Sequence, residues 1–354
     1  MTTQRQIEAP DSLEEINDSY YQRHLTDGLP IIPPTAERVA AMLQAVDRDP
    51  QEVLGQMAPK WAPATIQKVA INAVMAGCLP AYFPVVVTAV ECVLEEAFNL
   101  YGVQATTNPI GPCFVVNGPI RNELEMNCGY NVFGPGNRAN ATIGRAVRLV
   151  LNNIGGGVPG DLDRATQGWP GKYTLCFGEN EEASPWEPYS VDRDFPKGTN
   201  TITLFGIGGF TNLADLHSNT GLGILGTMCR LIAMGGGTPS GGSPLIVICP
   251  EHAGSMAEDG ISKADVRKYL FENARAKPSG FTPPVAEAWI GPRNRQTQVS
   301  GSNAPEFTVD SWGQLAPAVD HIQIVVAGGA GCHSALLSPS FGGVGTIVTK
   351  EIRK

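Results

Sequence analysis

The chain has 354 residues, of which 42% are hydrophobic and 17% charged, a composition that can bury one large α/β core or about two ordinary domains. The net charge of −9 argues against a nucleic-acid-binding protein, because a surface that follows phosphates needs clustered Lys and Arg. Residues 1–15 lack a signal-peptide pattern, and the most apolar windows, 69–78 and 85–94, are shorter than the roughly 20 residues that span a bilayer. We therefore expect a cytoplasmic protein that contacts neither nucleic acid nor membrane.

Eight cysteines are spread along the chain without a Cys-x-x-Cys pair. This spacing gives no support to a zinc ribbon or a zinc finger. In a reducing compartment we expect most of these cysteines to be free thiols that pack as small apolar residues.

Residues 1–100 are predicted to form a helical, proline-rich N-terminal region. Ser12 begins a first helix as a capping residue, whereas the prolines of residues 27–34 favour an extended segment. Residues 65–76 are apolar almost all round and are followed by a glycine, which is typical of a buried helix. Pro84 is well placed in the first turn of the next helix.

Residues 101–354 are predicted to form an α/β region that carries the catalytic site. Short apolar, β-branched runs alternate with helical patterns, as expected of strands that are covered on both faces. We therefore predict a mostly parallel or mixed sheet covered by helices. The strands are expected at 113–117, 201–205, 245–249 and 322–326, with a weaker one at 346–349. The helices are expected at 142–154, 219–233 and 263–275.

Residues 113–154 and 245–275 follow a similar order of strand, proline, polar loop, glycine and helix. This similarity raises the hypothesis of an internal duplication, a pseudo-repeat within the α/β region. The proline-rich residues 278–303 and the polar residues 178–198 are instead expected to form irregular loops or insertions.

The helix predicted at 142–154 carries apolar residues at helical spacing. At about 100° per residue, Arg145 and Arg148 fall opposite that apolar face. We expect both arginines to be solvated.

Because ligands of open α/β sheets bind outside the carboxyl ends of the strands, the residues that follow each strand are the first candidates for a site. Residues 327–334 follow one of these strands and are rich in glycine. Backbone N–H groups of such a turn can stabilise a thiolate or an oxyanion. Cys332 is therefore the best candidate nucleophile, with Gly329 and Gly331 as candidate substrate-binding residues and His333 as an imidazolium that would lower the pKa of the thiol. Alternatively, the glycines only form a close turn and Cys332 packs as a small apolar residue.

His252 and Glu251 lie directly after the strand predicted at 245–249. An imidazole at this rim can act as a general base or as a metal ligand, and we include Glu251 among the candidate catalytic residues. The alternative is a surface histidine in a loop.

The segment after the strand at 113–117 contains further candidate substrate-binding residues. A Gly-Pro-Gly turn that ends at Gly136 leads into a helix, whose first N–H groups can bind a carboxylate or phosphate. Arg138 would supply the opposing charge, and Asn117 and Asn131 would add polar contacts. Neither a Walker motif nor a dinucleotide fingerprint occurs here. Ordinary helix capping by the neighbouring asparagines is the alternative.

The sequence is compatible with the absence of a cofactor or with a divalent transition metal. The candidate metal ligands are His217, His252 and Glu181, because imidazole and carboxylate groups suit such ions. Their spacings follow no metal motif, so the sequence neither supports nor excludes the site. Glu181 belongs to a run of carboxylates with Glu179 and Glu182, which in the alternative interpretation is a solvated loop.

Three motifs resemble those of a poorly characterised bacterial family of about this length. They are Asp-Gly-Leu-Pro at 27–30, Phe-Gly-Pro-Gly-Asn-Arg-Ala-Asn-Ala-Thr-Ile-Gly-Arg-Ala at 133–146, and Gly-Glu-Asn-Glu-Glu-Ala-Ser-Pro-Trp at 178–186. The similarity covers most of the chain. The family is loosely associated with thiol or selenol proteins that carry a (seleno)cysteine-Gly-Ser-Cys motif, which implies thiol redox chemistry. That motif is absent from this sequence, where the nearest segment is Gly-Cys-His-Ser at 331–334.

Three functions follow as hypotheses. The leading one is an enzyme for a small polar or anionic substrate, in which Cys332 is the nucleophile or redox thiol and His252 or His333 is the general base. The second is a metal-dependent lyase, hydratase or hydrolase. The third is a non-catalytic subunit of a larger complex, whose proline-rich N-terminal arm wraps a neighbour. A homo-oligomer or a complex with a partner subunit is expected.

Overall fold

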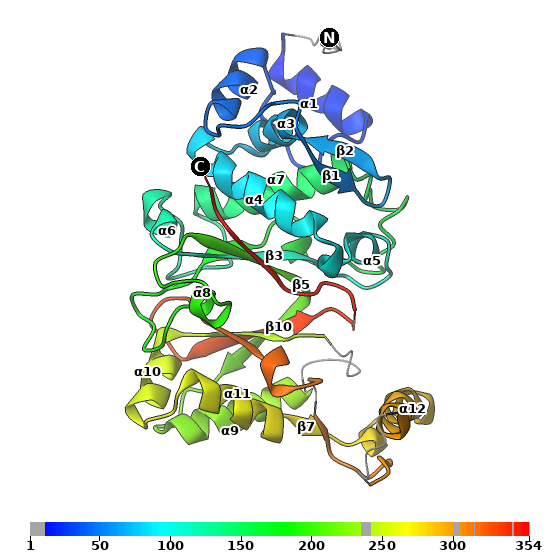
Figure 1. Ribbon diagram of the computed structural model, residues 1–354, viewed down its shortest axis with the longest axis vertical. Helices are drawn as coiled ribbons and strands as arrows, with labels where there is room; N and C mark the ends of the chain where they lie inside the picture. Colours follow the sequence, from blue (N-terminus) through cyan, green and yellow to red (C-terminus); the bar gives the residue numbers. More distant parts are fainter. Residues whose placement is uncertain (1–10, 235–241, 300–304, 315, 342, 354) are drawn as a thin grey trace.

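The computed structural model places a curled sheet between two layers of helices (Figure 1). Helices from the first part of the chain form the upper layer of the view, and helices from the second part form the lower layer. The C-terminus returns to the upper layer. The structure describes residues 11–234, 242–299, 305–314, 316–341 and 343–353.

The main sheet of the described residues is mixed. Its seven strands are β3 (Gly111–Asn117), β4 (Cys176–Gly178), β5 (Thr201–Ala214), β6 (Leu245–Ile248), β9 (Gln323–Val326), β10 (His333–Pro339) and β11 (Val348–Glu351). They lie in the order β4-β3-β5-β10-β6-β9, and β11 pairs with the first residues of β5. β3 and β4 are parallel, as are β6 and β9, and the other pairs are antiparallel. The predicted α/β fold with a mixed sheet is therefore confirmed.

The strand order of one half of the sheet repeats in the other half. β4-β3-β5 and β9-β6-β10 each combine a parallel pair with one antiparallel strand. Directly after β4, the N–H of Glu179 donates to the carbonyl of Val116 on β3, and directly after β9, the N–H of Ala327 donates to the carbonyl of Ile248 on β6. The internal duplication predicted for residues 113–154 and 245–275 stays a prediction.

The upper layer contains α1 (Leu13–Gln22), α2 (Ala36–Leu43), α3 (Ile66–Ala76), α4 (Phe83–Leu94), α5 (Leu100–Gln104), α6 (Ile120–Glu123) and α7 (Arg138–Asn153). Thr65 caps the N-terminus of α3, and Gly77, with a φ of 91°, caps its C-terminus. The predicted buried helix is thus confirmed. A hairpin of β1 (Val53–Met57) and β2 (Ala62–Thr65) adds strands to a region that the sequence predicts as helical.

The lower layer contains α9 (Gly221–Met234), α10 (Pro250–Glu258) and α11 (Lys263–Asn273). Ser262 and Asp265 form a capping box at the start of α11, so this helix begins where the sequence predicts it. The remaining elements are α8 (Tyr189–Asp192), α12 (Pro283–Val299), β7 (Arg275–Ala276) and β8 (Gly313–Gln314), with short 3₁₀ turns between them.

The proline-rich segment 278–303 is the clearest difference from the prediction. Its residues 300–303 lie outside the described residues, but most of the remainder forms the helix α12 instead of a loop. Pro283 and Pro284 occupy the first turn of this helix, where a missing N–H costs no intrahelical hydrogen bond. The sequence pattern also misses β4 and β10. β4 has only three residues, too few to show an alternation.

Arg145 and Arg148 are not solvated, contrary to the prediction. Arg145 donates two hydrogen bonds to the Asp27 carboxylate, at 2.8 and 2.9 Å. Arg148 is only 6% exposed. The reason is that the extended segment 27–34 and the loop before β4 cover this side of α7, so the helix is buried on more than its apolar face.

The inner face of the curled sheet carries apolar side chains from both halves. Val115 and Phe205 from the first half and Val247 and Leu337 from the second half belong to one buried cluster. Separate apolar clusters join each outer face to its own helices. The inner cluster therefore packs the two halves against each other.

Glu179 joins the two edges of the sheet. Its carboxylate is fully buried and accepts hydrogen bonds from the N–H of Tyr189 at 2.7 Å, from the amide of Asn117 at 2.5 Å, and from the N–H of Val326 on β9 at 3.4 Å. The next residue, Asn180, donates its own N–H to the carbonyl of Val326 at 2.8 Å. These bonds hold the end of β4 against the end of β9.

We expect Glu179→Ala to destabilise the fold strongly. The substitution removes the acceptor of the Tyr189 and Val326 N–H groups and one of the two acceptors of the Asn117 amide, which costs about 3–5 kcal/mol. Urea denaturation followed by circular dichroism measures this loss of unfolding free energy. Glu187→Ala, which removes an exposed carboxylate paired with Lys197, is the control and should change stability by less than about 1 kcal/mol. Equal effects of the two substitutions would contradict a joining role for Glu179.

Candidate functional site

A cavity of about 760 Å³ opens on the inner face of the sheet beside the predicted glycine loop. Its wall includes Gly329 and Gly331 of that loop, Asn131 of the loop before α7, and Val247 and Ala335 of β6 and β10. Three of the predicted substrate-binding residues thus line one cavity. Their role in binding stays a prediction.

The glycine loop at 328–331 forms part of the wall of this cavity. Gly328 and Gly331 have φ angles of 106° and 132°, a left-handed region that favours glycine. The N–H of Gly328 donates to the carbonyl of Cys128 at 2.9 Å. In the part of the chain that the structure describes, the N–H groups of residues 329–331 have no acceptor. They are available to a carboxylate or an oxyanion.

Cys332 faces a carboxylate instead of an imidazole. Its thiol donates a hydrogen bond to Oε2 of Glu251 at 3.3 Å, and this contact is the main cause that raises the pKa of Cys332. This carboxylate opposes ionisation of the Cys332 thiol, whereas the sequence led us to expect an imidazolium that favours it. The role of Cys332 as a nucleophile remains untested.

His333 does not touch Cys332 either. Its ring is exposed, and Nδ1 lies 3.1 Å from the side-chain amide of Asn212 on the neighbouring strand β5. Adjacent residues of a strand point to opposite sides, so the sequence neighbours do not form a pair. His333 instead lines the cavity.

His252 is buried in the first turn of α10. Its Nδ1 lies 2.8 Å from Oγ of Ser334, and its Nε2 lies 3.1 Å from the backbone carbonyl of Asp215. A carbonyl only accepts hydrogen bonds, so Nε2 carries a proton. Nδ1 is therefore the nitrogen that exchanges a proton with Ser334.

Cys249 is the thiol that Ser334 links to this histidine. It is the N-cap residue of α10 and is 2% exposed. Burial opposes ionisation of the thiol, but hydrogen bonds from His252 and Ser334 outweigh burial, so the pKa of Cys249 lies below its ordinary value. Conversely, the pKa of His252 is raised, because its bonds to Cys249 and to the Asp215 carbonyl outweigh burial.

Ser334 connects the thiol to the imidazole. Its Oγ lies 3.5 Å from Sγ of Cys249 and accepts the Cys249 N–H at 3.1 Å. A proton can pass from the thiol of Cys249 to the hydroxyl of Ser334 while the serine proton moves to Nδ1 of His252. This shift converts a neutral pair into a thiolate and an imidazolium, the state that the two pKa directions favour.

Sequence reasoning identified His252 but missed Cys249 and Ser334. The pattern Cys-Pro-Glu-His at 249–252 contains the signal. A proline in the first turn predicts a helix that starts at this point, which places the cysteine at the N-cap and the histidine three residues later on the same turn. Ser334 gives no such signal, because it reaches the pair only through the β6–β10 pairing.

Arg138 and Asn137, which follow the Gly-Pro-Gly turn, bond to groups within the protein, and anion binding at this turn stays a prediction. Arg138 donates from Nε and Nη2 to the carbonyl of Gly77 at 3.1 and 3.0 Å, which binds α7 to the end of α3. Asn137 caps α7 by accepting the N–H of Asn140. The alternative of ordinary capping is therefore what the structure shows, and Gly136 contributes a left-handed turn residue with a φ of 119°.

Asn117 and Glu181 lie in a buried polar network at the ends of β3 and β4. Asn117 donates to Glu179 and Glu181. Arg121, at 2% exposure of its side chain, pairs with Glu181 at 3.2 Å and with Glu182 at 3.1 Å. The carboxylate run is thus an ordered cluster around one arginine and not a solvated loop. Hydrogen bonds from Arg121 lower the pKa of Glu182 to about 2.

The predicted metal ligands do not meet. Glu181 pairs with Arg121 at the end of β4, His252 is engaged on α10, and His217 follows β5. In residues whose positions the structure describes, no group of three His, Cys, Asp or Glu side chains could hold a metal ion. The proposed set of three ligands is therefore wrong.

The comparisons with known proteins find no match: no family model, no curated protein and no solved structure resembles the chain. The motif resemblance described above stays a prediction. A search of the described helices finds none with both the length and the apolar character that a bilayer span requires.

The pairing of Cys249 with His252 predicts that the Cys249 thiol ionises at a lower pH than an ordinary cysteine. The ultraviolet absorbance of thiolates, titrated against pH in native protein and corrected by Cys249→Ser, should show a midpoint below the ordinary 9.0. His252→Gln should raise this midpoint by removing the positive partner, and Cys332→Ser, as the matched control, should leave it unchanged. A midpoint at or above 9.0 in the wild type would show that Cys249 is an ordinary buried thiol.

Proposed function

We propose that the protein is an enzyme that acts on a small polar or anionic molecule by thiol chemistry at Cys249. The observation that carries this proposal is the contact of a helix N-cap cysteine with Ser334, whose hydroxyl also contacts His252. A thiolate is the nucleophilic form of cysteine, and a neighbouring imidazolium and a helix N-terminus both stabilise it.

Comparison of the cysteines supports the choice of Cys249. All eight lie in the described part of the chain, and all are free. The pKa is lowered at Cys249 and raised at the other seven, with burial as the first cause in six of them. If all eight cysteines served only as apolar packing residues, a lowered pKa at one of them would have no function.

We propose that Cys332 takes part as a second thiol. It lies two residues before Ser334 on the chain, and its Glu251 partner lies in the same helical turn as His252. Glu251 is positioned to take the Cys332 proton. Cys249 would act as nucleophile, with His252 holding its proton, and Cys332 with Glu251 would serve as a proton donor.

The cavity limits the class of substrate. Its described lining contains apolar, amide, hydroxyl, indole and histidine side chains and no Lys, Arg, Asp or Glu. Neither Cys249 nor His252 belongs to this lining, and Ser334 connects it to them. Ser334 both lines this cavity and bonds to Cys249. A small molecule with an apolar body and one carboxylate or carbonyl oxygen fits such a wall best.

A turnover screen that covers several substrate classes tests the proposal. Pooled small carboxylic acids, thioesters and disulfides are incubated with the protein, and mass spectrometry follows which compounds disappear. We expect Cys249→Ser to lower the rate of any consumed compound by about 1,000-fold or more, because the nucleophile is lost. Cys332→Ser should lower it less.

Cys229→Ser is the matched control, since Cys229 is also buried but lies on α9, and burial raises the pKa of its thiol. This variant should keep wild-type turnover. A compound that the wild type and Cys249→Ser consume at equal rates, with both proteins folded, would overturn the assignment of the chemistry to Cys249.

A further inference from the structure

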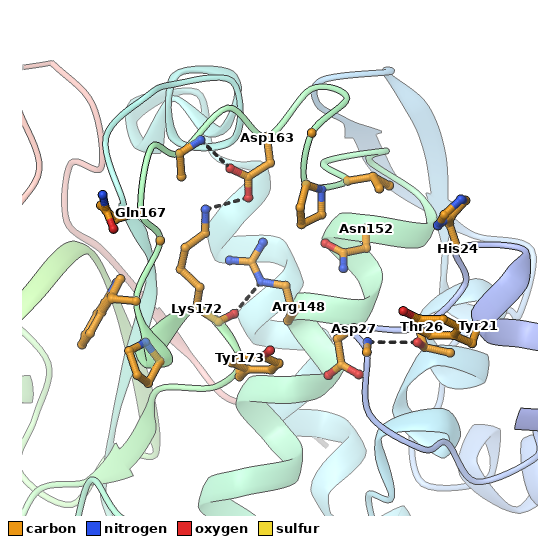
Figure 2. A pocket seen from close by; sticks show the side chains of 18 residues that line it. Tyr21, His24, Thr26, Asp27, Arg148, Asn152, Asp163, Gln167, Lys172 and Tyr173 are labelled. Atoms are coloured by element: carbon orange, nitrogen blue, oxygen red, sulfur yellow. Dashed lines mark hydrogen bonds and ion pairs between the residues drawn. The ribbon is translucent and has the colours of Figure 1, made fainter. Parts of the chain in front are cut away.

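A second cavity, of about 650 Å³, lies beside α7 (Figure 2). It adjoins the first cavity at Trp169 and Pro170, which line both, but none of the residues assigned to the thiol chemistry lines it. Tyr21 and Thr26 of the N-terminal segment form one side, and Asp163 and Lys172 of the loop before β4 form another. Arg148 lies between these two sides in the view. The chemistry proposed above makes no use of this cavity.

Arg148 is a buried cation without a carboxylate partner among the described residues. It is 6% exposed, and its bonds go to neutral groups: Nε donates to the carbonyl of Lys172 at 2.7 Å, and Nη1 donates to Oε1 of Gln104 at 3.3 Å. Nη2 has no partner in the described structure. Burial lowers the pKa of Arg148, which reflects the cost of an uncompensated buried charge.

The acidic groups near Arg148 are already paired with other cations. Asp163 binds Nζ of Lys172 at 2.6 Å, and Asp27 binds Arg145 at 2.8 Å. These five side chains comprise three cations and two carboxylates, so one positive charge remains. That charge belongs to Arg148, which lines the cavity.

Further unpartnered groups surround the same space. Oδ1 of Asn152 and Nε1 of Trp169 are buried without a hydrogen-bond partner in the described structure, and both residues line the cavity. Buried polar atoms are rarely left unpaired in native proteins. Several of them around one cavity indicate a missing polar ligand.

We propose that this cavity binds a small organic anion whose negative group pairs with Nη2 of Arg148. The amide of Asn152 and the indole N–H of Trp169 would bond to the polar part of the ligand. Tyr21 and Tyr173 would contact its apolar part. A carboxylate or a phosphate provides the required charge, since a guanidinium pairs well with both.

Binding of defined anions tests this site. Malonate and inorganic phosphate are added at matched ionic strength, with the uncharged malonamide as control, and the melting temperature and the calorimetric affinity are measured. We expect malonate or phosphate to raise the melting temperature of the wild type, and malonamide to leave it unchanged. A larger shift with phosphate would assign the site to a phosphate monoester, and a larger shift with malonate to a carboxylate.

Variants place the effect in the cavity. Arg148→Met should weaken the affinity about 10-fold or more, because it removes a charged hydrogen bond. Arg230→Met, which removes an exposed arginine on α9, should bind like the wild type. Should Arg148→Met fail to fold, Ala165→Trp fills the cavity without changing Arg148 and should abolish the shift. The proposal is overturned if no anion shifts the wild type, if malonamide acts like malonate, or if the shift persists in Arg148→Met or Ala165→Trp.

Discussion

The carboxylate of Glu179 is buried between β4 and β9, where it accepts hydrogen bonds from both halves of the curled sheet. Burial raises the pKa of this carboxyl group, because a buried negative charge is unfavourable. Its three hydrogen-bond donors offset part of this free-energy cost. The position of the glycine loop depends on this contact between the ends of β4 and β9. Asn180, next in the chain, donates its amide to the carbonyl of Gly328 at 3.3 Å, and the loop carries on directly to Cys332 and Ser334.

The repeated topology places different chemistry at equivalent positions. The residues that follow Val116 and Ile248 in the two halves are Asn117 and Cys249. Asn117 donates hydrogen bonds to the carboxylates of Glu179 and Glu181 and so belongs to the contact between β4 and β9. Cys249 is the N-cap residue of α10 and contacts Ser334, which in turn contacts His252. One half thus contributes to the contact between β4 and β9, and the other half carries the thiol to which we assign the proposed chemistry.

Sequence reasoning predicted the mixed α/β fold, the main strands and the helices that carry clear caps, because these depend on local patterns. It placed His252 at the rim of a strand for the same reason. It could not pair that histidine with Ser334, since the two residues are 82 positions apart and meet only through the pairing of β6 with β10. It also placed Arg148 in solvent, because a periodicity shows which face of a helix is polar but not whether another segment covers it.

The central claim is that Cys249 and His252 form a thiolate–imidazolium pair, and the protonation of His252 tests it most directly. Nitrogen-15 NMR of the imidazole distinguishes a ring with two N–H groups from a neutral tautomer. We expect His252 to stay doubly protonated above its ordinary pKa of 6.5 in the wild type, and to become neutral at the same pH in Cys249→Ser. A neutral His252 ring in the wild type just above pH 6.5, unchanged by Cys249→Ser, would contradict the account.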